Sequence, residues 1–186
     1  LGARRVKVIT NGFDSEDFGS VKGNMNDKKQ YVIRHIGMLS EQRNAESLWK
    51  AFAELASKKE GQLRIELIGI VADFLKRQLG EEFALKNYIN IQDSVPHQDL
   101  AEIYDSSDLL VLIQTKTNKK QTQLPGKLFE YLQAKRPILA IGDTESDLAK
   151  ILKQTKAGRC FHYDDQEGIL QFLTDAIEGN NHFTFE

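Results

Sequence analysis

Apolar residues along the chain fall into two alternating kinds of segment. Short runs rich in apolar and β-branched residues, typical of strands, alternate with longer stretches whose apolar residues recur every three or four positions, as in amphipathic helices. The expected strands are residues 6–10, 31–37, 63–69, 88–92, 108–114, 137–142 and 158–163. The expected helices are residues 45–59, 72–83, 98–104, 126–134, 146–152 and 166–177.

Several expected strands are apolar at every position, as in the run LLVLI at 109–113. Strands buried on both faces are usual where helices cover both sides of a parallel sheet. The alternation therefore predicts one α/β domain with a Rossmann-like, doubly wound parallel sheet. The polar, Gly/Asn-rich stretch 14–29 is interpreted as a linker or long loop, so that residues 1–30 lead into the domain.

Composition narrows the class of protein further. The chain has 186 residues and 40% hydrophobic content, enough for one domain with a substantial core. Its 25 Lys and Arg residues against 27 Asp and Glu leave a net charge of −2, so we expect no nucleic-acid partner. The single cysteine, Cys160, is interpreted as a buried strand thiol. A reducing cytoplasm is the expected location.

The start of the expected helix 126–134 has the features of a site where a ligand binds. Ligands of doubly wound sheets bind beyond the carboxyl ends of the strands, and this helix follows such an end. Pro125 suits the first helical position, because its missing N–H would have no helical partner. Leu124 has no side-chain oxygen to cap the free amides, and Gly126 lets a ligand approach the backbone. Such uncapped amides suit a phosphate.

One turn into this helix, Glu130 lies three residues after Lys127. A carboxylate at that place could accept hydrogen bonds from two vicinal hydroxyls, as on a ribose. The residues fit equally well an ordinary surface pair between Lys127 and Glu130, on a helix capped by Thr122 or Gln123. At this point both interpretations stay open.

A second helix start follows the expected strand 31–37. Gly37 ends the strand, and Asn44 is the expected N-cap of the next helix. Arg43 immediately precedes Asn44, and its guanidinium is suited to a diphosphate, although an exposed arginine is the alternative. Two anion-favouring helix starts in one sheet indicate more than either alone. His35 could face the same crevice, with a structural role as its alternative.

Several well-known signatures do not occur in the sequence. Neither the phosphate-binding pattern GxxxxGK[ST] nor the dinucleotide pattern GxGxxG is present. The sequence has no HExxH, no CxxC and no cluster of Cys and His with metal-ligand spacing. We therefore expect no metal site.

Four segments together resemble one known family. They are VITNGFD (8–14), IGMLSEQRN (36–44), VPHQDLAEIYDSSDLLVL (95–112) and LPGKLFEYLQAKRPILAI (124–141). In this order and spacing, the chain resembles the C-terminal, nucleotide-sugar-binding domain of a glycosyltransferase with the two-domain GT-B fold. The group is the large retaining one often called family 4, or glycosyl transferases group 1. The resemblance implies that residues 1–186 form one half of a GT-B architecture.

The resemblance implies a role for five residues in binding a nucleoside-diphosphate sugar as the donor substrate. Glu130 would hold the ribose hydroxyls, and Gly126 and Lys127 would offer backbone N–H groups to the diphosphate. Arg43 would neutralise the diphosphate, and Gly37 would let it lie close to the chain. The resemblance implies neither a cofactor nor a metal.

The base of the nucleotide would lie against two other segments. The resemblance implies that Ile70 and Val71, together with Ser94 and Val95, border it. The acceptor would be held by an N-terminal domain of the same enzyme, through which peripheral contact with a membrane is also conceivable. The present chain would then be a fragment of a longer enzyme, able to bind the donor but inactive in transfer.

The sequence departs from the family pattern at two positions. Many members have a paired-glutamate motif whose first glutamate would fall at 122, where this chain has Thr122. Many also have an arginine directly after the loop glycine, where this chain has Met38. These departures put contact with the transferred sugar in doubt and suggest a weaker or altered donor preference.

Two alternatives to a transferase remain. One is a Rossmann-like nucleotide-binding or regulatory module without catalysis. The other is a domain of a sugar-nucleotide epimerase, which shares the two-domain architecture but whose acidic and histidine residues we cannot assign in this sequence.

Overall fold

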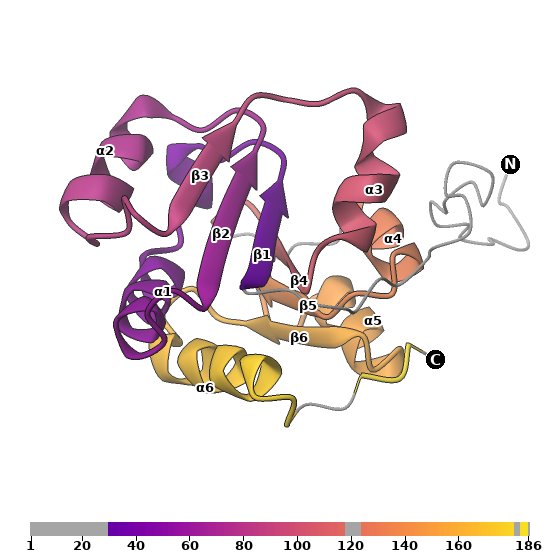
Figure 1. Cartoon of the computed structure of the whole chain (residues 1–186). Helices are drawn as coiled ribbons and strands as arrows, with labels where there is room; N and C mark the ends of the chain where they lie inside the picture. The colour runs from indigo at the N-terminus through magenta and orange to yellow at the C-terminus, as the bar shows by residue number, and fades with distance from the viewer. Residues whose placement is uncertain (1–29, 118–123, 181–182, 186) are drawn as a thin grey trace, which may run out of the picture.

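The computed structural model describes residues 30–117, 124–180 and 183–185 (Figure 1). Six strands form one sheet in the order β3-β2-β1-β4-β5-β6, and every pairing in it is parallel. This is the strand order of the Rossmann-like fold, so the expected fold class is confirmed. The expected strand 6–10 and the linker 14–29 lie outside the described residues.

The strands and helices alternate along the chain. The strands are β1 (Tyr31–Ile36), β2 (Leu63–Ile68), β3 (Ile89–Gln92), β4 (Leu109–Ile113), β5 (Ile138–Ile141) and β6 (Gly158–Phe161). The α-helices are α1 (Glu46–Lys58), α2 (Asp73–Glu81), α3 (Leu100–Asp105), α4 (Gly126–Gln133), α5 (Asp147–Gln154) and α6 (Gln166–Ile177). Two 3₁₀ turns, η2 (Glu41–Arg43) and η3 (His97–Asp99), precede α1 and α3.

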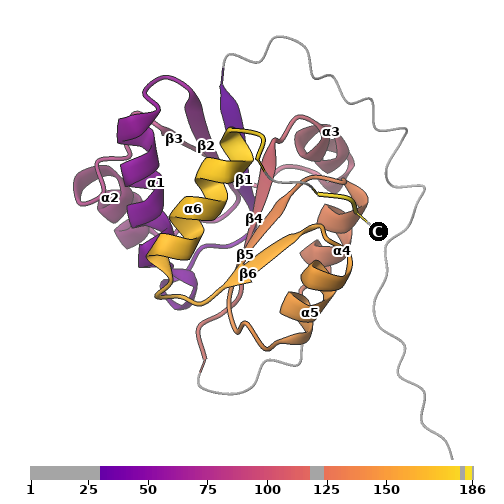
Figure 2. The same cartoon turned by 90° about the horizontal axis from the view of Figure 1, so that it is seen from below.

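The helices cover both faces of the sheet (Figure 2). Helices α1, α2 and α6 pack on one face, where Trp49 and Phe52 of α1 are among the largest buried side chains. Helices α3, α4 and α5 pack on the other face around Tyr104 and Tyr131. Strand β4 is buried along its whole length because it contributes side chains to both cores. The all-apolar sequence of β4 follows from that position.

Most elements lie within two residues of the expected bounds, and the segment before β4 differs most. One helix was expected over 98–104, whereas the chain first makes the 3₁₀ turn η3 and then α3. Pro96 stands at the N-cap of that turn with extended backbone angles, and Asp99 N–H donates to its carbonyl. No helix among the described residues is long and apolar enough to cross a membrane.

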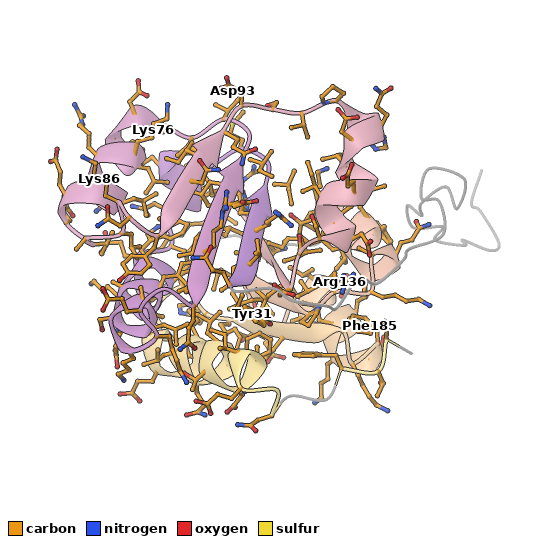
Figure 3. The ribbon with its side chains drawn as sticks, in the orientation of Figure 1. Tyr31, Lys76, Lys86, Asp93, Arg136 and Phe185 are labelled. Carbon is orange, nitrogen blue, oxygen red and sulfur yellow. The ribbon has the colours of Figure 1, made fainter. Side chains whose placement is uncertain are left out.

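The carboxyl ends of the strands share one edge of the sheet. Figure 3 shows Asp93, which follows β3, at the opposite end of the sheet from Tyr31, which begins β1. At this carboxyl edge the strand order reverses between β1 and β4, since β1 leads outward to β2 while β4 leads outward to β5. A crevice for ligands is expected at such a reversal.

A buried ion pair joins the neighbouring strands β1 and β2. Arg34 Nε lies 2.5 Å from Glu66 Oε2, and both side chains are almost fully buried. The guanidinium also donates to the carbonyl of Ile103 and to the hydroxyls of Ser106 and Ser107. The pair thus fixes the end of α3 against the sheet.

Replacing Glu66 with alanine should destabilise the fold severely. The variant Glu66→Ala leaves the Arg34 charge buried without its counter-ion, so the free energy of unfolding should fall by about 3 kcal/mol. Urea denaturation of wild type and variant measures this. The control is Glu54→Ala, which removes an exposed partner of Lys58 and should cost less than about 0.5 kcal/mol. Equal losses in the two variants would contradict the structural role of the buried pair.

Candidate functional site

A cleft of about 630 Å³ opens where the strand order reverses. Its walls come from the end of β1 and the loop after it, from β4 and the loop after it, and from the start of α4. Four of the five residues expected to bind the donor line it, namely Gly37, Arg43, Gly126 and Lys127. Residues 90 positions apart in the sequence therefore meet at one site, as the two helix starts suggested.

Arg43 is held at the cleft by the loops that follow β1 and β4. Its Nε lies 3.2 Å from Thr115 Oγ1, and its Nη1 lies 3.2 Å from the carbonyl oxygen of Met38. The backbone N–H of Lys116 donates to the carbonyl of Gln42 at 2.7 Å, which ties the loop after β4 to the 3₁₀ turn η2. The guanidinium is therefore fixed beside the cleft while its charge has no carboxylate partner among the described residues.

The start of α4 forms the opposite wall of the cleft. Pro125 stands at the N-cap, and no side chain of the described residues makes a capping hydrogen bond there. The alternative caps Thr122 and Gln123 lie outside the described residues. The first amides of a helix have no intrahelical partner, so those of Gly126 and Lys127 remain available where these residues line the cleft. Together with the positive end of the helix dipole, they favour an anion.

Glu130 lies one turn further along α4 and is not among the residues that line the cleft. Lys127 Nζ lies 2.7 Å from Glu130 Oε2, and the hydroxyl of Tyr104 donates to the same oxygen at 2.5 Å. Partial burial acts to raise the pKa of Glu130, but these two hydrogen bonds outweigh it and hold the pKa below its usual value. The carboxylate is ionised, and the ordinary Lys127–Glu130 pair that the sequence left open does form.

Two glycines let the loops after β1 and β2 lie against each other. Gly37 has φ +143° and Gly69 has φ +128°, values that side chains disfavour. A Cβ on Gly69 would lie 2.3 Å from the carbonyl oxygen of Gly37. These positions require glycine, and the backbone of Gly37 is thereby exposed to the cleft without a side chain of its own.

His35 lines the cleft from the end of β1. Its Nδ1 lies 3.0 Å from the carbonyl oxygen of Val111, so Nδ1 carries the proton and Nε2 the lone pair. Burial lowers the pKa of His35 to about 4, and the positive charges of Arg43 and Lys127 lower it as well. The imidazole is therefore neutral at pH 7.

The residues expected to border the base do not line the cleft. Ile70 is 62% exposed, whereas Val71 is buried in the core and pairs with Leu39 in an isolated bridge. Ser94 is exposed, and Val95 packs partly against the α3–α4–α5 core. Their contact with a base stays a prediction.

Asn44 does not cap α1, which corrects the expectation from the sequence. The N-cap is Ala45, without a side-chain hydrogen bond. The carboxamide oxygen of Asn44 instead accepts a hydrogen bond from Trp49 Nε1 at 2.8 Å, and its nitrogen donates to Gln78. The 3₁₀ turn η2 displaces the helix start, and the buried indole needs a hydrogen-bond acceptor.

The remaining sequence expectations fall on different parts of the chain. Thr122 lies outside the described residues. Met38 is 48% exposed and lines the cleft where an arginine is common in the family. Cys160 is a buried thiol as expected, and burial raises its pKa to about 12. Within the described ranges, no group of three or more His, Cys, Asp or Glu side chains could hold a metal ion.

Comparison with known proteins agrees with this geometry. The six-stranded parallel sheet, with its cleft at the strand reversal, is the fold of one half of a GT-B glycosyltransferase. The model of the family "Glycosyl transferases group 1" matches residues 30–178, and the chain belongs to this family. No curated protein sequence matches the chain.

Solved glycosyltransferases share the fold at low sequence identity. The chain is similar to WaaG, a glycosyltransferase involved in lipopolysaccharide biosynthesis, with a TM-score of 0.71, 15% identity and coverage of 92% of this chain and 47% of WaaG. It is similar to HepE of Anabaena, solved in complex with UDP and glucose, with a TM-score of 0.66, 18% identity and coverage of 94% and 48%.

The chain also resembles an isolated domain. The C-terminal domain of the group 1 glycosyltransferase LpcC from Francisella tularensis matches with a TM-score of 0.59, 18% identity and coverage of 80% of this chain and 75% of that domain. Against WaaG and HepE, the chain spans about half the length of the matched protein. The likeness thus concerns one of the two domains.

The neutral state of His35 predicts a pH dependence of stability. Its pKa is about 4 in the folded chain and about 6.5 when unfolded, so below pH 6.5 only the unfolded chain takes up this proton. Stability should therefore fall as the pH drops from 6.5 towards 4. Between pH 7 and pH 5, this contribution should reach on the order of 2 kcal/mol.

Urea denaturation of wild type and His35→Asn at both pH values measures the contribution. Asparagine keeps a donor for the carbonyl of Val111 but does not titrate, so the variant should lose correspondingly less stability on acidification. If wild type and variant lost the same free energy between pH 7 and pH 5, the buried neutral histidine would be contradicted.

Proposed function

We propose that this domain binds a nucleoside-diphosphate sugar and serves as the donor half of a glycosyltransferase. The observation that carries the proposal is that Arg43 and the first residues of α4 line the same cleft. Both features favour an anion, and they meet at the edge of the sheet where doubly wound folds bind ligands. Membership of the glycosyltransferase family supports the same reading.

The diphosphate would lie between Arg43 and the amides of Gly126 and Lys127. Gly37 presents only backbone there, so the phosphates can approach the chain closely. When the bond to the sugar breaks, negative charge grows on the departing diphosphate, and preorganised donors aimed at it lower the barrier. We infer that the guanidinium and the helix start perform this role without a metal ion.

Glu130 would accept hydrogen bonds from the ribose. Its lowered pKa keeps the carboxylate ionised, and both of its described side-chain bonds end on Oε2. Oε1 is thus left for a hydroxyl, while Tyr104 and Lys127 fix the orientation of the carboxylate. Ile70, Val71, Ser94 and Val95, which follow β2 and β3 outside the cleft wall, would border the base.

The proposal assigns the acceptor to a second domain. The similar proteins solved with UDP and glucose and with UDP and GlcNAc are about two and nearly three times as long as this chain, respectively. We infer that an N-terminal domain of the same enzyme holds the acceptor in line with the anomeric carbon. A cytoplasmic location remains a prediction.

The chain should bind nucleoside diphosphates with modest affinity through this cleft. We expect UDP or GDP to bind with about 4 to 7 kcal/mol, in the micromolar to millimolar range. Arg43→Ala removes a charged donor and should weaken binding by about 1.5 to 3 kcal/mol, and Glu130→Ala by about 1 to 3 kcal/mol. Isothermal titration calorimetry measures both losses.

Arg77→Ala is the matched control, because Arg77 is an exposed arginine of α2 outside the cleft. It should bind like wild type. Unchanged affinity in Arg43→Ala, or an equal loss in Arg77→Ala, would argue against a diphosphate at this cleft.

The isolated chain should transfer no sugar, and donor binding should not need a metal. Proximity of a held acceptor supplies several kcal/mol of a transfer barrier, and the described chain offers no group assigned to an acceptor. Mass spectrometry of reactions with UDP-glucose and simple acceptors should detect no product, and excess EDTA should leave UDP affinity unchanged. Transfer by this chain alone, or loss of binding in EDTA, would contradict the corresponding part of the proposal.

A further inference from the structure

Two buried acceptor atoms at the cleft lack hydrogen-bond partners. His35 Nε2 and Gln114 Oε1 make no hydrogen bond within the described part of the chain. Their residues are only 6% and 5% exposed, and both belong to the wall of the cleft. A buried acceptor without a partner costs stability, so two at one site require an explanation.

The acceptor character of His35 follows from its surroundings. Because Nδ1 donates to the carbonyl of Val111, the lone pair is on Nε2. Nε2 lies near Gly37, where an added Cβ would be 3.8 Å from it. The two cations nearby, Arg43 and Lys127, disfavour a second proton on the ring. His35 therefore presents an acceptor, not a donor, beside the glycine of the cleft.

Gln114 is fixed in a similar way at the end of β4. Its backbone N–H donates to the carbonyl of Ile141, and its own carbonyl accepts a hydrogen bond from the hydroxyl of Tyr163. Its carboxamide oxygen lies against Gly142, where an added Cβ would come within 2.1 Å of it. The glycine leaves room for the carboxamide, so the position of the side chain is set by packing.

The chemistry of the cleft is divided between donors and acceptors. Arg43 and the start of α4 offer hydrogen-bond donors, which suit a diphosphate, because an ionised diphosphate only accepts. His35 Nε2 and Gln114 Oε1 need donors, which a diphosphate at neutral pH does not supply. Sugar hydroxyls do supply them. The ribose is assigned to Glu130, which is not part of the cleft wall.

We propose that His35 Nε2 and Gln114 Oε1 accept hydrogen bonds from hydroxyls of the sugar that the donor carries. These two residues then determine how the domain distinguishes a sugar nucleotide from the bare nucleoside diphosphate. The inference rests on the proposed function, since it places the sugar next to a diphosphate bound by Arg43 and α4. These contacts to the sugar do not need the glutamate that many family members have at position 122, where this chain has Thr122.

Two substitutions of His35 distinguish the roles of its two ring nitrogens. Asparagine places an amide near Nδ1, so His35→Asn can keep the bond to Val111 while it removes the acceptor. Glutamine reaches the place of Nε2, so His35→Gln keeps an acceptor and gives up the bond to Val111. Gln114→Met removes the second acceptor at similar side-chain length.

Gln133→Met is the matched control. Gln133 also has a buried carboxamide oxygen without a hydrogen-bond partner among the described residues, but it lies at the far end of α4 and outside the cleft. Thermal unfolding of each variant shows whether it is folded. Calorimetric titrations of all variants with UDP and with UDP-glucose then measure the two affinities separately.

The expected result is a selective loss of affinity for the sugar nucleotide. His35→Asn and Gln114→Met should each weaken UDP-glucose binding about fivefold and change UDP binding less than twofold, because one hydrogen bond to the sugar is lost. His35→Gln should bind UDP-glucose more tightly than His35→Asn, and Gln133→Met should match wild type.

Two results would overturn the inference while the proposed function stands. Equal losses for UDP and UDP-glucose would place His35 and Gln114 against the nucleotide or diphosphate, and no loss for either ligand would make their role structural. If wild type bound neither UDP, GDP nor their sugar conjugates, the proposed function itself would fail, and the inference with it.

Discussion

The site depends on one topological constraint, the reversal of strand order between β1 and β4. From β1 the chain winds outward through β2 and β3, and from β4 it winds outward through β5 and β6. The crossovers of the two halves therefore diverge, and the carboxyl ends of β1 and β4 are left uncovered. The turn that holds Arg43 and the start of α4 flank this opening. Polar groups can reach a ligand at this opening because no helix of the described chain covers these strand ends.

The fold was largely predictable because both kinds of periodicity are strong. A strand such as β4, apolar at all five positions, buries both of its faces only when helices cover both sides of the sheet. The two helix starts at the cleft were also readable, since Arg43 and Gly126 lie between an expected strand and the start of the next expected helix. What the sequence could not provide were partners distant along the chain. Tyr104 reaches Glu130 over 26 positions.

Predictions from local sequence were wrong where a buried side chain needed the same polar group for a hydrogen bond. Asn44 is a good N-cap by residue type, yet its carboxamide serves the indole of Trp49 inside the core. His35 gave no clear signal of its own, because its tautomer is set by the carbonyl of Val111, which is 76 residues away. Sequence patterns identify where a ligand could bind, while the direction of each hydrogen bond depends on the packed structure.

The central claim is that the diphosphate of a nucleotide lies between Arg43 and the start of α4. Backbone amide NMR during titration with UDP tests it most directly, because a phosphate that accepts a hydrogen bond from an amide changes the chemical shift of that amide proton. The account predicts the largest shift changes at Gly126 and Lys127, with little change at Tyr31 at the opposite end of the sheet. Changes centred away from these two amides, while UDP binds, would contradict it.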